Sequence, residues 1–149
     1  RCYQAFEAYS ASHIRGLDLT PAQFDIVATL GNTPGMSFKE LGEKTLITKG
    51  TLTGVVDRLE AQRLVRRSAS AEDGRSMIVS LTPAGERLFG RAFAAHLGHL
   101  RLALSGLSAA QLQRFETTLR SLRGAFESAP AAEPSPTVAG RSKTRRPGE

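Results

Sequence analysis

Residues 48–63, which read TKGTLTGVVDRLEAQR, are the stretch from which the fold is inferred most directly. Apolar residues recur there at i, i+3, i+4 and i+7 and predict an amphipathic helix; they are Leu52, Val55, Val56 and Leu59. The opposite face carries Gly50 and Gly54, flanked by Thr51 and Thr53, although glycine costs about 1 kcal/mol relative to alanine in a helix interior. Such a small, hydroxyl-bearing face suits a DNA major groove, which just admits a helix. A second helix packed on the glycines is the alternative.

The preceding residues extend this helix to a larger motif. Ser37-Phe38-Lys39-Glu40 has the pattern of a capping box and predicts a short helix that ends near Thr45. A tight turn over residues 45–47 then leads to Thr48, the expected N-cap of the longer helix, which runs to about Arg63. Two helices joined in this way predict a helix-turn-helix, whose second helix enters the major groove.

Two strand-like stretches follow at residues 64–68 and 76–81, and an Asp-Gly turn signal lies between them at residues 73–74. We interpret this hairpin as a wing, with Arg66 and Arg67 on one strand and Arg75 at the tip. Arginine at a hairpin tip suits the narrow, electronegative minor groove. Arg58, on the outer flank of the preceding helix, joins these candidate DNA-binding residues.

Asp57 and Glu60 also lie near the groove-facing side of the same helix. Bare carboxylates at that place would repel phosphates, so we expect Asp57 to pair with a neighbouring arginine, which the pattern does not identify.

Start signals predict four further helices: one from the N-terminus to about Arg15, and others that begin at Thr20-Pro21, Thr82-Pro83 and Ser108. Gly31 is expected to stop the helix that begins at Pro21. The order predicts a mainly α protein with a small β-hairpin (α+β). We expect residues 1–127 to form one regulator domain, with a winged helix-turn-helix at 20–82 and dimerisation helices at 1–17 and 84–127. Residues 128–149, rich in proline and basic residues, predict a disordered basic tail.

The last predicted helix carries an apolar seam with alternating spacings of three and four, suited to a helical partner; it consists of Leu112, Phe115, Leu119, Leu122 and Phe126. The first helix and the long helix after the wing carry comparable stripes, and none of the three has an evident partner within the winged region. We therefore expect these helices to form a homodimer that sets two recognition helices about one DNA turn apart. Packing of the seam within one chain is the alternative.

Composition narrows the class of protein. The chain has 149 residues, and 20 Lys+Arg against 14 Asp+Glu give a net charge of +6. This charge indicates either an anionic partner, such as nucleic acid, or a solvated basic surface. No apolar run approaches the ~18 residues that span a bilayer, so we expect a cytoplasmic protein with no membrane association. Since the chain begins at Arg1, we also expect a preceding segment.

No phosphate loop, nucleophile elbow or zinc-protease motif is present in the sequence. We therefore expect neither enzymatic activity nor a cofactor.

Four runs of residues, at the distances they keep from one another, are typical of one family: Leu19-Thr20-Pro21-Ala22-Gln23-Phe24, residues 37–59, Asp73-Gly74-Arg75, and Val79-Ser80-Leu81-Thr82-Pro83-Ala84-Gly85. Over about residues 1–126 the chain closely resembles the multiple-antibiotic-resistance regulator (MarR) family. The resemblance implies a bacterial, homodimeric winged-helix transcription factor, usually a repressor of a pseudo-palindromic operator in double-stranded DNA. Many members release DNA when a small anionic phenolic compound, a metal ion or an oxidant reaches them.

The resemblance also implies roles for particular residues. Those that match the positions contacting bases and phosphates are Thr48, Lys49, Thr51 and Thr53. Ser37 matches a helix start whose hydroxyl and free backbone N–H hold a phosphate. Arg75 matches the wing-tip arginine, and Asp73 matches the acid that orients this arginine through a salt bridge.

Family effectors often bind in the cleft between the dimerisation helices and the winged domain. Candidates to line it for a small aromatic or anionic effector are Tyr9, His13, Arg15 and Phe24, together with His96 and His99. The spacing of His96 and His99 permits a metal site, but no nearby acid or cysteine completes one, so a pair of surface histidines is the simpler interpretation. The single Cys2 could act as a redox sensor, but only Arg1 is near enough to activate it.

The expected function is therefore sequence-specific transcriptional regulation, most simply repression that a small molecule relieves. The alternative is an architectural or protein-interaction winged-helix module without a specific operator.

Overall fold

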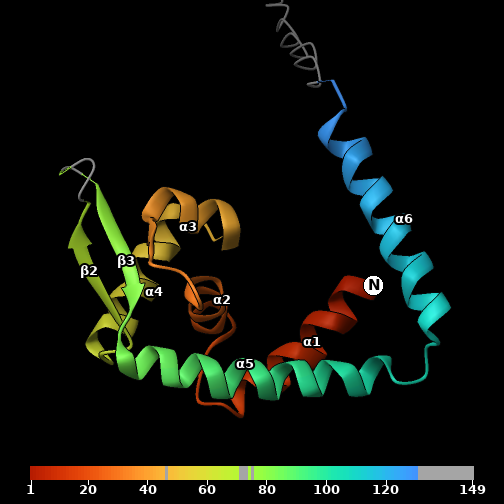
Figure 1. The fold of residues 1–149 in the computed structure, drawn as a ribbon, viewed down its shortest axis with the longest axis horizontal. Coiled ribbons are helices and arrows are strands. Elements are labelled where there is room, and N and C mark those ends of the chain that lie inside the picture. Colours follow the sequence, from red (N-terminus) through yellow and green to blue (C-terminus); the bar gives the residue numbers. More distant parts are fainter. Residues whose placement is uncertain (46, 71–73, 75, 131–149) are drawn as a thin grey trace, which may run out of the picture. The chain divides into compact units, whose positions relative to one another are not determined.

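The computed structural model describes residues 1–45, 47–70, 74 and 76–130 (Figure 1). Contacts divide the chain into two units, Arg1–Gly106 and a second unit from Leu107 onward. Asp73, Arg75 and nearly all of the predicted tail lie outside the described residues.

The described elements follow the order expected from the sequence, with one addition. The helices are α1 (Cys2–Arg15), α2 (Pro21–Leu30), α3 (Phe38–Thr45), α4 (Lys49–Ala61), α5 (Pro83–Leu104) and α6 (Ala109–Glu127). The strands are β1 (Met36–Ser37), β2 (Val65–Ala69) and β3 (Met77–Leu81). None of the described helices has the length and apolar character that crossing a bilayer requires.

Helix starts are determined by local hydrogen bonds, mostly as predicted. Thr20 and Ser108 each form a complete capping box with the glutamine three residues later, and the Thr82 hydroxyl accepts a hydrogen bond from the Gly85 N–H at 3.1 Å. The prediction for Thr48 is correct in position but wrong in chemistry. Its side chain caps no backbone N–H and instead donates to the Thr51 hydroxyl at 3.1 Å.

The sheet contains three antiparallel strands in the order β1-β3-β2, where the sequence predicted two. The hairpin itself has Val65 opposite Leu81 and Arg67 opposite Val79. The additional strand β1 pairs Met36 with Val79. It is only two residues long, too short to show the alternation by which a strand is recognised.

The main core lies between α2, α3, α4, the sheet and the start of α5. The apolar face predicted for residues 48–63 is completely buried in it. Gly31 ends α2 as predicted, but with an ordinary negative φ. A Cβ at Gly31 would lie 2.3 Å from the Phe89 ring, so the glycine is required by close packing and not by a left-handed cap.

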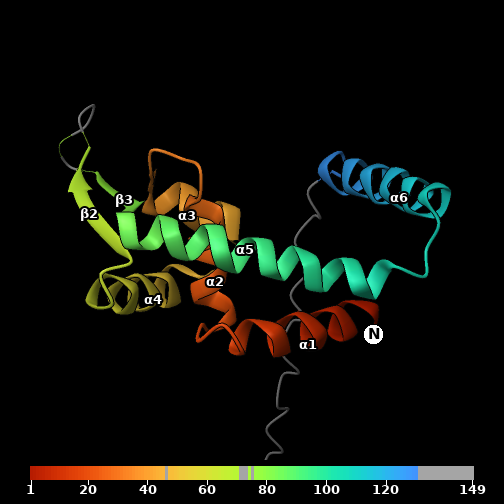
Figure 2. The ribbon, with the colours of Figure 1, turned by 60° about the horizontal axis from the view of Figure 1, so that its bottom comes forward.

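The expectation that the first helix has no partner within the winged region is wrong, because α1 packs against Phe24 of α2. Ile14 is buried in a second cluster with Leu19, Phe24 and Ala92, and α1 runs beside α5 (Figure 2). Because Ile14 and Ala92 lie 78 positions apart in the chain, the sequence pattern could not show that they share a cluster. Only the N-terminal part of α1 keeps exposed apolar side chains, on Tyr3 and Phe6.

Helix α6 contains no buried residue. Four of its five predicted seam residues are large, exposed apolar side chains: Phe115, Leu119, Leu122 and Phe126. Charged residues on the same helix form i,i+4 pairs, including Arg120 with Glu116 at 2.6 Å. The apolar seam thus lacks a cover among the described residues of its own unit, from Leu107 onward.

Candidate DNA-binding interface

Helix α4 presents an open face of small residues. A Cβ built on Gly50 or Gly54 meets no atom within 4 Å. The alternative that a second helix of the described chain packs on these glycines is therefore wrong. Since nothing in the described chain occupies this face, another molecule can approach the α4 backbone closely there.

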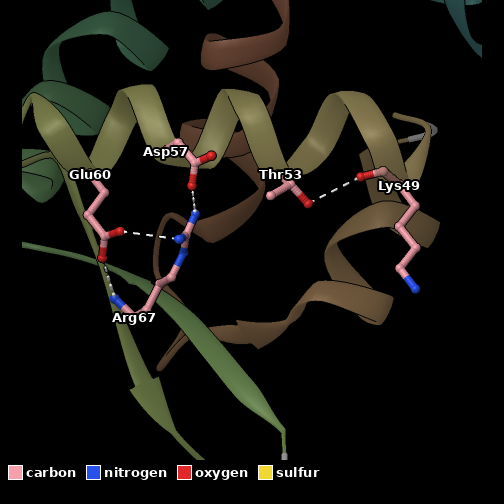
Figure 3. A network of polar contacts seen from close by, with 5 residues as sticks. All are labelled: Lys49, Thr53, Asp57, Glu60 and Arg67. Atoms are coloured by element: carbon pink, nitrogen blue, oxygen red, sulfur yellow. Dashed lines mark hydrogen bonds and ion pairs between the residues drawn. The ribbon is translucent and has the colours of Figure 1, made fainter.

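Two threonine hydroxyls on this face donate hydrogen bonds to acceptors within the chain. The Thr53 hydroxyl donates to the Lys49 carbonyl at 3.3 Å (Figure 3), and Thr48 donates to Thr51. A hydroxyl that donates internally still offers oxygen lone pairs and, in threonine, a methyl group. Thr53 therefore presents an acceptor and an apolar contact to whatever approaches α4.

One guanidinium connects the wing to this helix. Arg67 on β2 forms ion pairs with Asp57 and, at 3.4 Å, with Glu60 (Figure 3). The prediction that Asp57 pairs with a neighbouring arginine is confirmed, and Arg67 is that arginine. The role of Glu60 as a second partner was missed, because only the tertiary fold brings β2 against α4.

The other candidates differ in their surroundings. Arg58 and Arg66 are exposed, and the Arg66 Nε–H donates to the Ser80 hydroxyl at 3.2 Å, which holds its stem on the sheet. Asp73 and Arg75 lie outside the described residues, so their roles stay predictions.

The expectation that Ser37 has a free backbone N–H is wrong. Its backbone N–H is not free but donates to the Glu40 carboxylate at 2.9 Å, and its hydroxyl donates to the same oxygen at 2.8 Å. These hydrogen bonds, the backbone one first, lower the pKa of Glu40 below its ordinary value. The capping box predicted for this helix thus uses the group expected to hold a phosphate.

An aromatic cluster lies between α1 and α5, where the two helices pack side by side. His96 is buried, and its Nδ1 lies 3.2 Å from Nδ1 of His13. His99 stacks on His13 and on Tyr9, with ring centroids 4.4 and 4.0 Å apart. Phe24 meets the His96 ring edge-on. Within the described part of the chain, no group of three or more His, Cys, Asp or Glu is placed to hold a metal ion.

The histidine pair predicts that acid destabilises the fold. Burial, and then the neighbouring histidines, lower the pKa of His96, and burial also lowers the pKa of His13. The neutral form of each group is therefore favoured more in the folded state than in the unfolded state, and stability falls as pH drops below about 6.5, where the unfolded chain takes up the protons. We expect the melting temperature to fall by several degrees between pH 7.5 and 5.5. His13→Gln with His96→Gln should flatten this dependence, and an equally steep profile in the double variant would contradict the assignment.

A cavity of about 850 Å³ opens between α1 and α2. Phe24 and His96, two of the six predicted effector residues, line it, whereas Tyr9, His13 and His99 do not and Arg15 is exposed. The described lining includes two carboxylates that were not predicted from the sequence, those of Glu7 and Asp25, and no lysine or arginine. Their sequence positions gave no chemical signal, since the cavity forms only when α1 folds onto α2.

A helix-turn-helix whose second helix has an open face, followed by a β-hairpin, defines a winged-helix DNA-binding protein. The sequence model of the MarR family matches residues 17–76. The chain is 34% identical to the homoprotocatechuate degradative operon repressor of Escherichia coli, over 60% of each chain. A probable transcriptional regulator from Pseudomonas aeruginosa has a similar structure, with a TM-score of 0.70 and 36% identity over 80% of this chain and 90% of that one.

A second solved structure is BpsR of Bordetella bronchiseptica, whose DNA binding is regulated by 6-hydroxynicotinic acid. It is similar at a TM-score of 0.71 and 28% identity, over 81% of this chain and 92% of that one. Taken with the family match, these similarities show that the chain belongs to the MarR family of transcriptional regulators.

Proposed function

We propose that this chain acts in the cytoplasm as a homodimeric repressor, without enzymatic activity, that binds a pseudo-palindromic operator. The observation that carries the proposal is the open glycine and threonine face of α4, where a Cβ at Gly50 or Gly54 would meet nothing within 4 Å. The face belongs to the helix that enters the major groove in a helix-turn-helix. Exposed Lys49 and Arg58 supply positive charge for the phosphates.

Dimerisation is supported by the uncovered seam of α6. A row of exposed phenylalanines and leucines on one helix is suited to burial against a second copy. Two-fold symmetry would then place one α4 in each half of the operator, about one DNA turn apart.

Relief by a small aromatic ligand is supported by the cavity between α1 and α2, which has aromatic walls from Tyr3, Phe6 and Phe24. The repressor name of the Escherichia coli relative and the ligand regulation of BpsR agree with this proposal. The carboxylates of Glu7 and Asp25 favour an aromatic ligand that is not strongly anionic.

The test is footprinting on the DNA upstream of the protein's own gene, in excess unrelated DNA. A repressor dimer should protect two symmetric half-sites, and protection should survive the competitor. Added aromatic compounds should release it. Protection that the competitor removes would instead indicate an architectural protein.

Thr53→Val should relax sequence discrimination and leave non-specific binding unchanged. Valine keeps the shape of threonine but loses the oxygen that the Thr53 geometry leaves free to accept. A base-edge contact contributes about 1–3 kcal/mol of discrimination, so the preference at one symmetric pair of base positions should weaken accordingly. The matched control is Thr117→Val on α6, where the hydroxyl also donates one turn back along its helix, to Gln113 at 2.9 Å. The affinity of each protein variant for a panel of single-base operator variants measures the base preference. An unchanged base preference in Thr53→Val would exclude this contact.

A further inference from the structure

We propose that Arg67 is a positioning residue that holds the wing against the recognition helix, and not a phosphate contact. This inference rests on the proposed function, since it concerns how two DNA-reading elements are kept at one geometry. Its basis is the set of contacts around one side chain that joins β2, α4 and α3.

Arg67 contacts the recognition helix through both its side chain and its backbone. Its guanidinium forms ion pairs with Asp57 and with Glu60, which lie one turn apart on α4. Its backbone N–H donates to the other oxygen of Glu60 at 3.2 Å. Glu60 thus binds both the strand and the side chain that the strand carries.

The same guanidinium also contacts α3. Its central carbon lies 5.4 Å from the centroid of the Phe38 ring, within cation–π range. Phe38 is the first residue of α3. One side chain thereby connects the wing with both helices of the helix-turn-helix.

Burial restricts Arg67 to this position. Its side chain is only 25% exposed, compared with 55% for Asp57. Its Nε is buried and has no hydrogen-bond partner among the described residues. An extension toward a phosphate would break both ion pairs and leave two carboxylates unpaired beside the DNA.

The position of Arg67 along β2 explains what these contacts can control. The strand leaves α4 through a short turn in which Arg63 has a φ of 58°, and Val65 anchors the strand start in the core. Arg67 lies two residues further toward the wing tip. Contacts at this point limit how far the hairpin can tilt away from α4.

Charge provides the decisive test. Asp57→Asn removes a negative charge from the DNA-facing side, so electrostatics alone would make the variant bind DNA more tightly. If Asp57 instead holds Arg67, the wing loosens, and we expect operator affinity to fall about ten-fold. Arg67→Lys should cause a similar loss, because lysine keeps the charge but cannot bridge two carboxylates with a planar fork.

The two variants should not be additive. The combination of Asp57→Asn with Arg67→Lys should bind about as well as either alone, because both remove the same contact. The matched control is Glu43→Gln, which removes an exposed carboxylate of α3 that has no ion pair within the described chain. This control should bind at least as tightly as the unchanged protein.

Operator binding and backbone hydrogen exchange are measured on the same samples. Faster exchange at the Arg67 amide in Asp57→Asn, with the exchange of α2 unchanged, would show that the wing loosens without global unfolding. A chain that binds no operator overturns the proposed function, whereas the exchange result still tests the contact. The proposal is wrong if Asp57→Asn binds as tightly as the unchanged protein, if Arg67→Lys binds normally, or if the two losses add.

Discussion

Gly54→Leu is expected to abolish operator binding while the protein stays folded. A Cβ at this position meets no atom within 4 Å, so the chain itself has room for a larger side chain. Leucine also favours the helix by about 0.8 kcal/mol relative to glycine, and the melting temperature should stay constant or rise by a few degrees. The major groove just admits a helix. A leucine on the face that enters it should hold α4 away from the base edges and weaken binding by about 100-fold or more.

The matched control for this prediction is Gly90→Leu on α5. Like Gly54, Gly90 is a glycine within a helix with nothing within 4 Å of a Cβ, and Gly90 is exposed. The control should retain operator binding. Normal operator binding by Gly54→Leu would mean that this face of α4 does not approach DNA.

Leu119→Glu combined with Leu122→Glu is expected to give a folded monomer that no longer binds the operator. These side chains are 49% and 50% exposed in the single chain, and α6 contributes no buried residue. The core of residues 1–106 should therefore survive two new charges on α6. A dimer interface would bury those charges without partners, which disfavours association strongly. A monomer reaches one half-site only, so operator affinity should fall by about 100-fold or more.

Light scattering coupled to size exclusion measures the assembly state, and circular dichroism measures folding. The control places two glutamates on the opposite face of α6, at Gln113 and Thr117, and should remain dimeric. If the unchanged protein is already a monomer at micromolar concentration, the seam does not join two copies.

The parts of the fold that depend on neighbours within one or two helical turns could be predicted from the sequence. The capping boxes at Thr20 and Ser108 connect residues three positions apart. The apolar face of α4 is a consequence of helical spacing alone. Its position after a capped short helix and before a hairpin was sufficient to predict the winged helix-turn-helix.

Which distant residues meet depends on how the helices and strands pack together. His13 and His96 are 83 positions apart, and β1 exists only because Met36 meets Val79. The sequence predicted an arginine partner for Asp57 but could not select Arg67 over its neighbours, since the choice depends on how β2 leaves α4. Gly31 has a similar explanation, because the Phe89 ring that requires it comes from another helix. Local hydrogen bonds and helical periodicity depend on residues that are close in the sequence, so a short stretch can predict them. The contacts between distant residues depend on the packing of whole helices and strands, which no short stretch of sequence encodes.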